Sequence, residues 1–445
     1  MTNSPCLYFR GLLAALSVAS LSATAVEPTA STVVLVNTGS TAAHAKLNFH
    51  EVDGKVASTL ERDIPPLGIA LLPVLLAGFD GAAQVFSDQP VRALVLNAGS
   101  GNKVRDSYEG TAPTTAASFP LLRVPGGDGR NTQMSVHNTD AAAAAEVKLR
   151  YLDESGSEVD SRTATLPPLG SFNFDADGVG GTGAIAGALE SSVPVVAAEQ
   201  IIESGDGISL PAIAEQDECK RCIVGFAKIG RKTKSPQWTE IHIQNRGTAT
   251  AKVKLAYYDA KGRAKSAMTR DIPAQGFARF DTRAVGATGN DFVGYAIVSQ
   301  DSAEQPLAVQ WRVQDRRGLH RIGFNATDEA EGSSLWACPN APRRKMGNAP
   351  VATHLVAVNP GQSVVTAKVA LYDPTTGARL VEKTYVLRGK GQINIDLKAD
   401  KFRKAGIGFA GLAMIRALNG QSLFVSAYNE YKNGGSSGYT CLPQD

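Results

Sequence analysis

The chain has 445 residues, of which 20% are charged and 7% are aromatic, and its formal net charge is +3. This length exceeds what a single ordinary hydrophobic core organises, so we expect several domains. Its 44 glycines and 22 prolines are typical of a protein with many turns between strands. The low aromatic content argues against a surface of aromatic platforms for sugars.

Residues 1–25 are predicted to be an export signal. Arg10 is the only charge ahead of the apolar run Gly11–Ser22, which is too short for a stable membrane span. Ala23-Thr24-Ala25 fits a small-residue cleavage site, so we expect the exported chain to begin at Val26. Cys6 precedes the apolar run, which disfavours a lipoprotein site. We expect no transmembrane segment in the remainder.

The clearest pattern is residues 239–262, TEIHIQNRGTATAKVKLAYYDAKG. Ile241 and Ile243 alternate with polar residues, as in a half-buried strand, and Asn245 then begins a turn. A second strand follows, in which Val253, Leu255 and Tyr257 share one face. This stretch therefore predicts a β-hairpin.

Versions of this hairpin recur at residues 32–54, 132–156 and 353–377. Each copy has an asparagine in its first turn and an aspartate in its second, namely Asn37, Asn138, Asn245 and Asn359, and Asp53, Asp153, Asp259 and Asp373. The asparagines are separated by 101, 107 and 114 residues. This spacing predicts four tandem modules of similar size.

A second shared block follows each hairpin. It reads RDIPPLG at 62–68, ATLPPLG at 164–170, RDIPAQG at 270–276 and, more divergently, VLRGKG at 386–391. A small-residue strand such as GYAIVS at 294–299 comes next, and then an apolar strand such as PLAVQWRV at 306–313. Each module therefore offers about seven short strands, which suits a β-sandwich of ~100 residues.

This recurring pattern resembles the tandem immunoglobulin-like repeats of bacterial secreted and surface proteins. The resemblance implies an all-β fold of four antiparallel β-sandwich modules outside the cytoplasm, and it implies no catalytic residue. The predicted modules are 26–118, 119–216, 217–335 and 336–445. Adjacent modules are either hinged or stacked, and the sequence does not distinguish these arrangements.

Four cysteines follow the predicted signal: Cys219, Cys222, Cys338 and Cys441. An even number in an exported protein favours disulfides. The similar segments GSSLWAC (332–338) and GSSGYTC (435–441) favour Cys219–Cys222 with Cys338–Cys441. The alternative is a bond from Cys219 or Cys222 to Cys338. The C-x-x-C spacing also permits a redox pair or half of a zinc site, but we favour a structural disulfide.

The sequence contains no recognisable catalytic or cofactor motif. HExxH and a phosphate-binding glycine loop are both missing, so we predict neither an enzyme nor a cofactor. His137 and His242 lie on the polar face of their predicted strands and are expected to face solvent. We interpret the repeated aspartates as caps of their own turns rather than calcium ligands, since calcium needs six to eight oxygens.

Charge is distributed unevenly. The two modules after residue 25 carry 11 basic and 23 acidic residues, and the last two carry 33 basic and 19 acidic residues. Candidate contacts for an anionic partner are Lys228, Arg231, Lys232, Lys234, Arg343, Arg344, Lys345, Lys398, Lys401, Arg403 and Lys404. Nucleic acid is not an expected partner, because these residues lack interleaved aromatics.

The predicted function is that of a secreted, non-enzymatic structural or adhesive protein of the cell exterior. A rod with an acidic and a basic half is able to associate head-to-tail into filaments. The basic half is alternatively a docking surface for an anionic cell-surface polymer or for lipid headgroups. The competing hypothesis is a periplasmic or extracellular binding array for a polysaccharide or partner protein, with Trp238, Trp311 and Trp336 as its only tryptophans.

Overall fold

The computed structural model describes residues 16–19, 30–74, 79–99, 103–125, 130–180, 183–203, 206–230, 236–284, 291–301, 304–315, 320–343, 351–406, 408–431 and 436–444. This part of the chain is mostly β-strand, and its described ladders are antiparallel. Its only helices are the short 3-10 helices η1 (Glu215–Asp217), η2 (Thr282–Ala284), η4 (Glu329–Glu331) and η5 (Asp400–Ala405). None of the described helices has the length and apolar character that a membrane crossing requires.

Among the described residues, strand pairing gives five sheets, which the sequence repeat groups into four successive sets. The first set comprises β1 (Leu16–Ala19), β2 (Ala30–Asn37), β3 (Ala43–Glu51), β4 (Val56–Ile64), β5 (Ile69–Pro73), β6 (Gly81–Ser87), β7 (Val91–Gly99) and β8 (Lys103–Glu109). The second comprises β9 (Thr114–Val124), β10 (Arg130–Asn138), β11 (Ala145–Leu152), β12 (Glu158–Leu166), β13 (Ser171–Asp175), β14 (Gly183–Glu203), β15 (Asp206–Pro211) and β16 (Ile213–Ala214).

The third set comprises β17 (Cys222–Gly230), β18 (Gln237–Asn245), β19 (Ala251–Asp259), β20 (Ala264–Ile272), β21 (Phe277–Asp281), β22 (Asp291–Gln300), β23 (Leu307–Asp315), β24 (His320–Asn325) and β25 (Thr327–Asp328). The fourth comprises β26 (Leu335–Arg343), β27 (Val351–Val358), β28 (Val365–Tyr372), β29 (Arg379–Leu387), β30 (Gln392–Asp396), β31 (Phe409–Ala417), β32 (Phe424–Tyr431), β33 (Ser436–Thr440) and β34 (Leu442–Pro443).

The same strand order recurs in the sets. In the third set it is β20-β19-β22-β17-β18-β23-β24, with β21 also on β18, and the fourth set repeats it as β29-β28-β31-β26-β27-β32-β33. The first set has the same neighbours split into two sheets, β1-β6-β3-β4 and β5-β2-β7-β8. In the third set, Ile241 and Ile243 of β18 pack in one buried cluster with Val253 and Leu255 of β19. The paired strands of the third set therefore enclose a shared apolar core.

The repeated turn residues have the same structural role in every set. The side-chain amide of Asn245 donates to Ala249 O at 2.8 Å and to Ile272 O at 3.0 Å, and its Oδ1 accepts from the backbone of Gly247 at 2.9 Å. Asn37, Asn138 and Asn359 make equivalent bonds. The aspartates accept backbone N–H groups of their own turns, as Asp259 does from Lys261 at 2.9 Å, which is the Asx-turn geometry predicted from the sequence.

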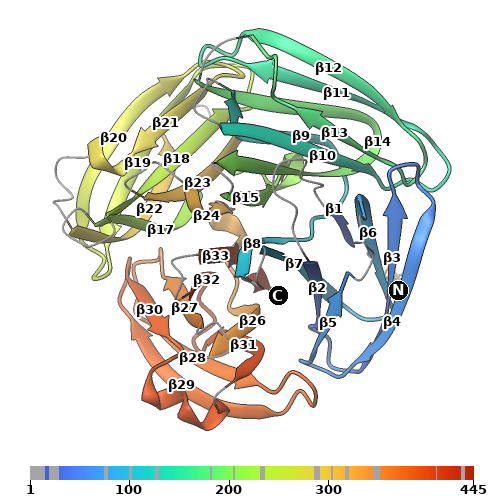
Figure 1. Cartoon of the computed structure of the whole chain (residues 1–445). Helices are drawn as coiled ribbons and strands as arrows, with labels where there is room; N and C mark the ends of the chain where they lie inside the picture. Colours follow the sequence, from blue (N-terminus) through green and yellow to red (C-terminus); the bar gives the residue numbers. More distant parts are fainter. Residues whose placement is uncertain are drawn as a thin grey trace, which may run out of the picture.

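The four sets close into a ring (Figure 1). At each seam the turn that contains the repeated aspartate, here called the aspartate turn, meets the turn between the fourth and fifth strands of the next set, the receiving turn. A Cβ on Gly54 would lie 2.1 Å from Pro168 O, and the corresponding distance is 2.1 Å for Gly156 and Ala274 O. It is 2.5 Å for Gly262 and Gly389 O, and 2.1 Å for Gly377 and Pro66 O. The last contact joins the fourth set back to the first.

Backbone hydrogen bonds join the turns across three of these seams: Ser171 N to Val52 O, Gln392 N to Ala260 O and Ile69 N to Pro374 O, at 3.0, 3.1 and 3.0 Å. Apolar residues fill the space behind them. One buried cluster runs from Ile297 of the third set through the fourth set to Val34 of the first. Each seam thus repeats one contact between consecutive sets.

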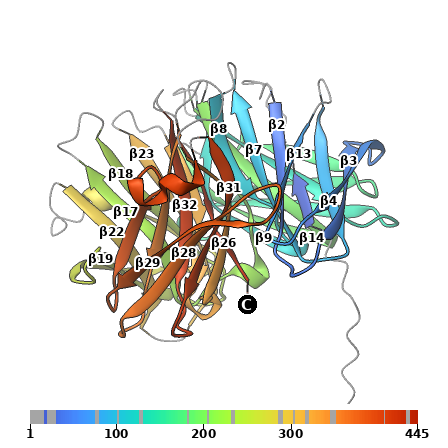
Figure 2. The same cartoon turned by 90° about the horizontal axis from the view of Figure 1, so that it is seen from below.

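The last long strand of each set faces the ring centre. Viewed edge-on, β2, β7 and β8 run along the ring axis (Figure 2). Around the centre β8 contacts β15 and β33, and β24 contacts the same two strands. Ser107 donates to Gly438 O at 3.1 Å, and Asn325 donates to Pro211 O at 3.0 Å. The four strands therefore contact one another in a closed circuit.

Two features differ from the geometry assumed from the sequence. The rod assumed for the filament hypothesis is instead a ring, because the aspartate turns curl each set onto the next. The strand β9 begins at Thr114, ahead of the predicted boundary at 118, and pairs with the second set. Residues 141–144 form no helix and precede β11.

Candidate functional site

The predicted basic contacts fall into three groups. Arg231, Lys232, Lys234, Arg344 and Lys345 lie outside the described residues. Lys228 and Arg343 are held by the protein. Lys398, Lys401, Arg403 and Lys404 are exposed beside or within η5. The candidate binding surface is therefore this last group, which we call the η5 patch.

Arg343 positions the η5 patch rather than contacting a partner. Its side chain is only 2% exposed. Its Nε donates to Leu397 O at 3.0 Å, and its Nη1 donates to Gly406 O at 3.1 Å, at the two ends of the η5 segment. The prediction that Arg343 is a surface contact is therefore wrong, because its side chain is buried and backbone carbonyls accept its hydrogen bonds. Lys228 Nζ similarly donates to Gln237 Oε1 at 2.9 Å.

Packing fixes the η5 segment from within. Phe402 is fully buried in the core of the fourth set. Lys401 Nζ lies 4.2 Å from the centre of the Tyr385 ring on β29, a cation–π geometry. Phe402 therefore anchors the helix to the core, while Lys401, Arg403 and Lys404 remain exposed.

The charge of the patch is only partly compensated. Asp396 and Asp400 lie in the same segment, and Asp396 Oδ1 accepts the backbone N–H of Lys398 at 2.7 Å. No described ion pair engages the four cations, whereas Lys368 and Arg379 of the same set both pair with Glu382. The patch therefore presents a net positive field suited to an anionic surface.

A cavity of about 530 Å³ lies at the seam between the fourth and first sets. Its walls include the apolar side chains of Leu67, Leu335 and Met414. Its charged walls are Lys368, Arg379, Arg416 and Glu382, with Glu382 at 2.7 Å from Lys368 and 2.8 Å from Arg379. The hydrogen bond from Lys368 lowers the pKa of Glu382. The cavity thus combines an apolar wall with an excess of cations.

A buried charged cluster joins the second and third sets. Arg312 Nη2 lies 2.7 Å from Glu199 Oε1, and both side chains are fully buried. Glu240 lies 3.6 Å from Arg123 and 3.3 Å from Arg279. Glu199 of the second set thus pairs with Arg312 of the third set, whereas Arg123 and Glu240 pair across the same seam with the charges reversed.

The histidines expected to face solvent are buried at the seams. His137 and His242 are 0% exposed, so that prediction is wrong. The polar face of their strands is covered by the preceding set. The ring of His137, for example, lies against the ring of His50 of the first set, with the ring centres 5.8 Å apart. Burial lowers the pKa of His137 to about 3. Burial also lowers the pKa of His242 to about 4, despite its 3.0 Å contact with Glu240.

Two disulfides join Cys219 to Cys222 and Cys338 to Cys441, which is the pairing favoured from the sequence. The second closes the fourth set by linking β26 to the residue after β33. All three tryptophans are buried, with Trp238 the most exposed at 7%. They therefore form no exposed aromatic groove for a glycan.

No protein-family model matches this chain, and no curated protein matches it by sequence. Among solved structures, one described as Thermotoga maritima 1070 has 11% identity and a TM-score of 0.21, covering 25% of this chain and 95% of that one. The α-L-rhamnosidase of Streptomyces avermitilis has 9% identity and a TM-score of 0.14, covering 88% and 56%.

A tetra-tandem repeat from the extending region of a large adhesion protein has 12% identity and a TM-score of 0.11, covering 91% of this chain and 92% of that one. The last two of these neighbours are, by their descriptions, a glycosidase and a repeat of an adhesion protein. Similarity at this level supports no inference about activity.

The contacts between consecutive sets were not predicted from the sequence. A signal for them was present, because each aspartate turn ends in a glycine and three of the four receiving turns contain proline. Leu67, Leu169, Gln275 and Lys390 occupy the same place in the receiving turns with φ values of 58°, 58°, 61° and 53°. A residue with a positive φ at the same position of each receiving turn indicates that the four turns share one shape.

Proposed function

We propose that this chain is an exported, non-enzymatic structural or adhesive protein, in which four immunoglobulin-like modules form one ring that docks on an anionic polymer of the cell exterior. The two disulfides support an extracellular location. The observation that carries the docking role is the η5 patch, whose four cations are exposed on an anchored segment.

Because the chain forms a ring, the head-to-tail filament predicted from the sequence has to be reconsidered. Head-to-tail filaments need free complementary ends. Here every aspartate turn already meets a receiving turn of the same chain. The proposal is therefore a ring that acts as a single unit, with no filament formed through these turns.

The binding-array alternative is favoured by one observation, the cavity between the fourth and first sets. Its apolar wall beside Arg416 and Lys368 suits a small anion with an apolar body. In that case the ring is a ligand-binding protein, and the η5 patch is a solvated surface without a partner.

The test is retention of residues 26–445 on immobilised dextran sulfate as salt is raised. The triple variant Lys401→Ala, Arg403→Ala, Lys404→Ala should bind at least tenfold more weakly, since each cation near an anionic surface contributes about 1 kcal/mol. The matched control Lys46→Ala, Lys254→Ala, Lys261→Ala removes three exposed charges elsewhere and should retain wild-type binding. Equal retention of all three proteins would contradict the docking role and favour the binding alternative.

A further inference from the structure

The first strand set is completed by a segment of the predicted export signal. β1 pairs antiparallel with β6 in the register Leu16↔Val85, Ser17↔Gln84, Val18↔Ala83 and Ala19↔Ala82. The other edge of β6 pairs with β3. β1 also lies against β7 of its own set and against β10 and β14 of the second set. It therefore occupies a place at the first seam of the ring.

The other sets fill the same place with a strand of their own. β17 pairs with β22 and β26 pairs with β31, while β9 pairs with the first half of β14. In the third set Cys222 and Val224 stand opposite Val298 and Ala296, and all four residues belong to one buried core. The strand at this place thus contributes alternate apolar residues to the core of its set.

In the first set, the strand that pairs with β6 likewise has to contribute apolar residues to the core. Val85 and Ala83 belong to its buried core. Residues directly opposite each other in an antiparallel pair share a face of the sheet. The positions opposite Val85 and Ala83 are therefore core positions, and the position opposite Gln84, which is itself buried, faces the seam.

Export would empty this place. Cleavage before Val26, which is part of the proposed function, removes β1 and leaves only residues 26–29 ahead of β2. In the second set the connection between β9 and β10 alone takes residues 125–129. The remaining residues are too few to turn back and pair with β6. An unpaired strand edge in an otherwise complete sheet is a template for another strand.

We propose that the β6 edge of the exported chain is a binding site for an extended peptide segment of another polypeptide, apolar at two alternate positions and small and polar between them. The segment adds to the sheet antiparallel to β6, as β1 does, so that main-chain hydrogen bonds supply affinity and the two core positions supply specificity. Because the site lies at the first seam, the bound segment also contacts β10 and β14.

Hydrogen exchange on residues 26–445 tests this site. The alternate β6 amides that face away from β3 should exchange at least tenfold faster than their counterparts in β22, which is paired on both edges. Adding the peptide AALSVASL, the sequence of residues 14–21, should slow them at least tenfold. The same peptide with proline in place of its valine, which corresponds to Val18→Pro, should leave them unchanged, because proline donates no hydrogen bond.

Three results would overturn the proposal. The first is β6 exchange already as slow as that of β22 without peptide. The second is no slowing by the peptide. The third is an intact mass of the exported chain that includes Leu16–Ala19, because the chain would then fill its own site. None of these results bears on the η5 patch, so failure here is distinct from failure of the docking role.

Discussion

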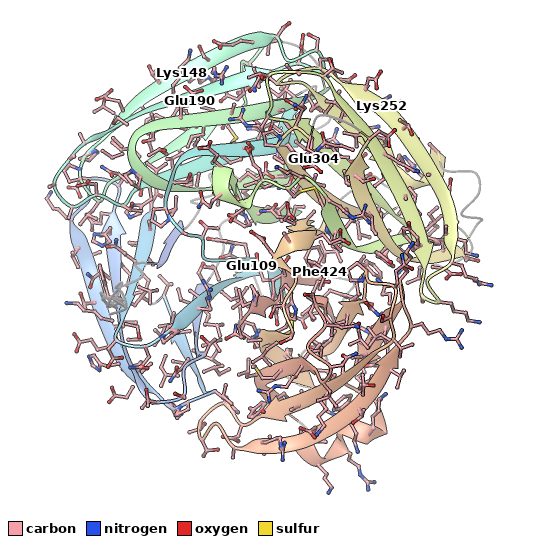
Figure 3. The ribbon with its side chains drawn as sticks, turned by 180° about the vertical axis from the view of Figure 1, so that it is seen from behind. Glu109, Lys148, Glu190, Lys252, Glu304 and Phe424 are labelled. Atoms are coloured by element: carbon pink, nitrogen blue, oxygen red, sulfur yellow. A yellow bond between two sulfur atoms is a disulfide. The ribbon has the colours of Figure 1, made fainter. Side chains whose placement is uncertain are left out.

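At the scale of single residues, the chain buries ionisable groups where sets meet. Glu109 lies on β8 near the ring centre (Figure 3), and its Oε1 is buried without a hydrogen-bond partner in the described structure. Burial raises the pKa of Glu109 to about 7. Burial has the opposite effect on His137, lowering its pKa to about 3. Both groups favour their neutral forms in the ring.

The two groups give opposite dependences of stability on pH. Below pH ~6.5 the unfolded chain protonates His137 while the folded ring does not, so stability falls as pH falls toward 3, by at most about 1.4 kcal/mol per pH unit. Glu109 holds its proton longer in the folded ring, so its contribution is complete below pH ~4.5 and is lost as pH rises through about 7.

We therefore expect His137→Asn to flatten the loss of stability between pH 6.5 and 4.5. The measurement is urea unfolding at both pH values, compared within each protein. His44→Asn is the control, because His44 is exposed and its hydrogen bond to Asp63 raises its pKa. The assignment fails if His137→Asn keeps the wild-type slope, or if His44→Asn flattens it equally.

At the scale of elements, the contact between an aspartate turn and a receiving turn is the feature that is repeated at each seam. The two hairpin strands could be predicted because their alternation is local, as in the pattern of Val253, Leu255 and Tyr257. The burial of His242 and Gln244 could not be predicted from the same alternation, since β18 is buried on both faces. Its second face is covered by another set, and no local pattern encodes which set that is.

Gly156 tests the turn contact. Gly156→Ala places a Cβ 2.1 Å from Ala274 O at a φ of +85°, so the seam between the second and third sets has to shift. Gly420→Ala is the matched control, because Gly420 has a φ of +67° but no atom within 4 Å of its Cβ position. The control should lose about 1–2 kcal/mol of unfolding free energy from backbone strain alone.

Thermal unfolding of both variants gives the comparison. Gly156→Ala should lose clearly more stability than Gly420→Ala and should expose the seam residues Leu152 and Phe277, which now share one buried cluster. Equal losses would mean that the turn contact contributes nothing beyond the strain of the φ angle.

At the scale of the whole molecule, the ring brings the acidic and the basic halves of the chain side by side (Figure 1). Acidic and basic halves meet at two seams, and one of them holds the buried pair of Arg312 and Glu199. The repeat and its all-β character were predictable from spacing and turn residues. Ring closure was not, because it depends on contacts such as Ser107 with Gly438, 331 positions apart in the chain.

The most direct test of the ring is small-angle X-ray scattering of residues 26–445 at low and at 1 M salt. A closed ring should give a radius of gyration near the ~22 Å expected for a compact chain of this length. The value should not change with salt, because the seams are held by buried contacts and backbone hydrogen bonds. A much larger radius at either salt, with the profile of an extended rod, would contradict the account.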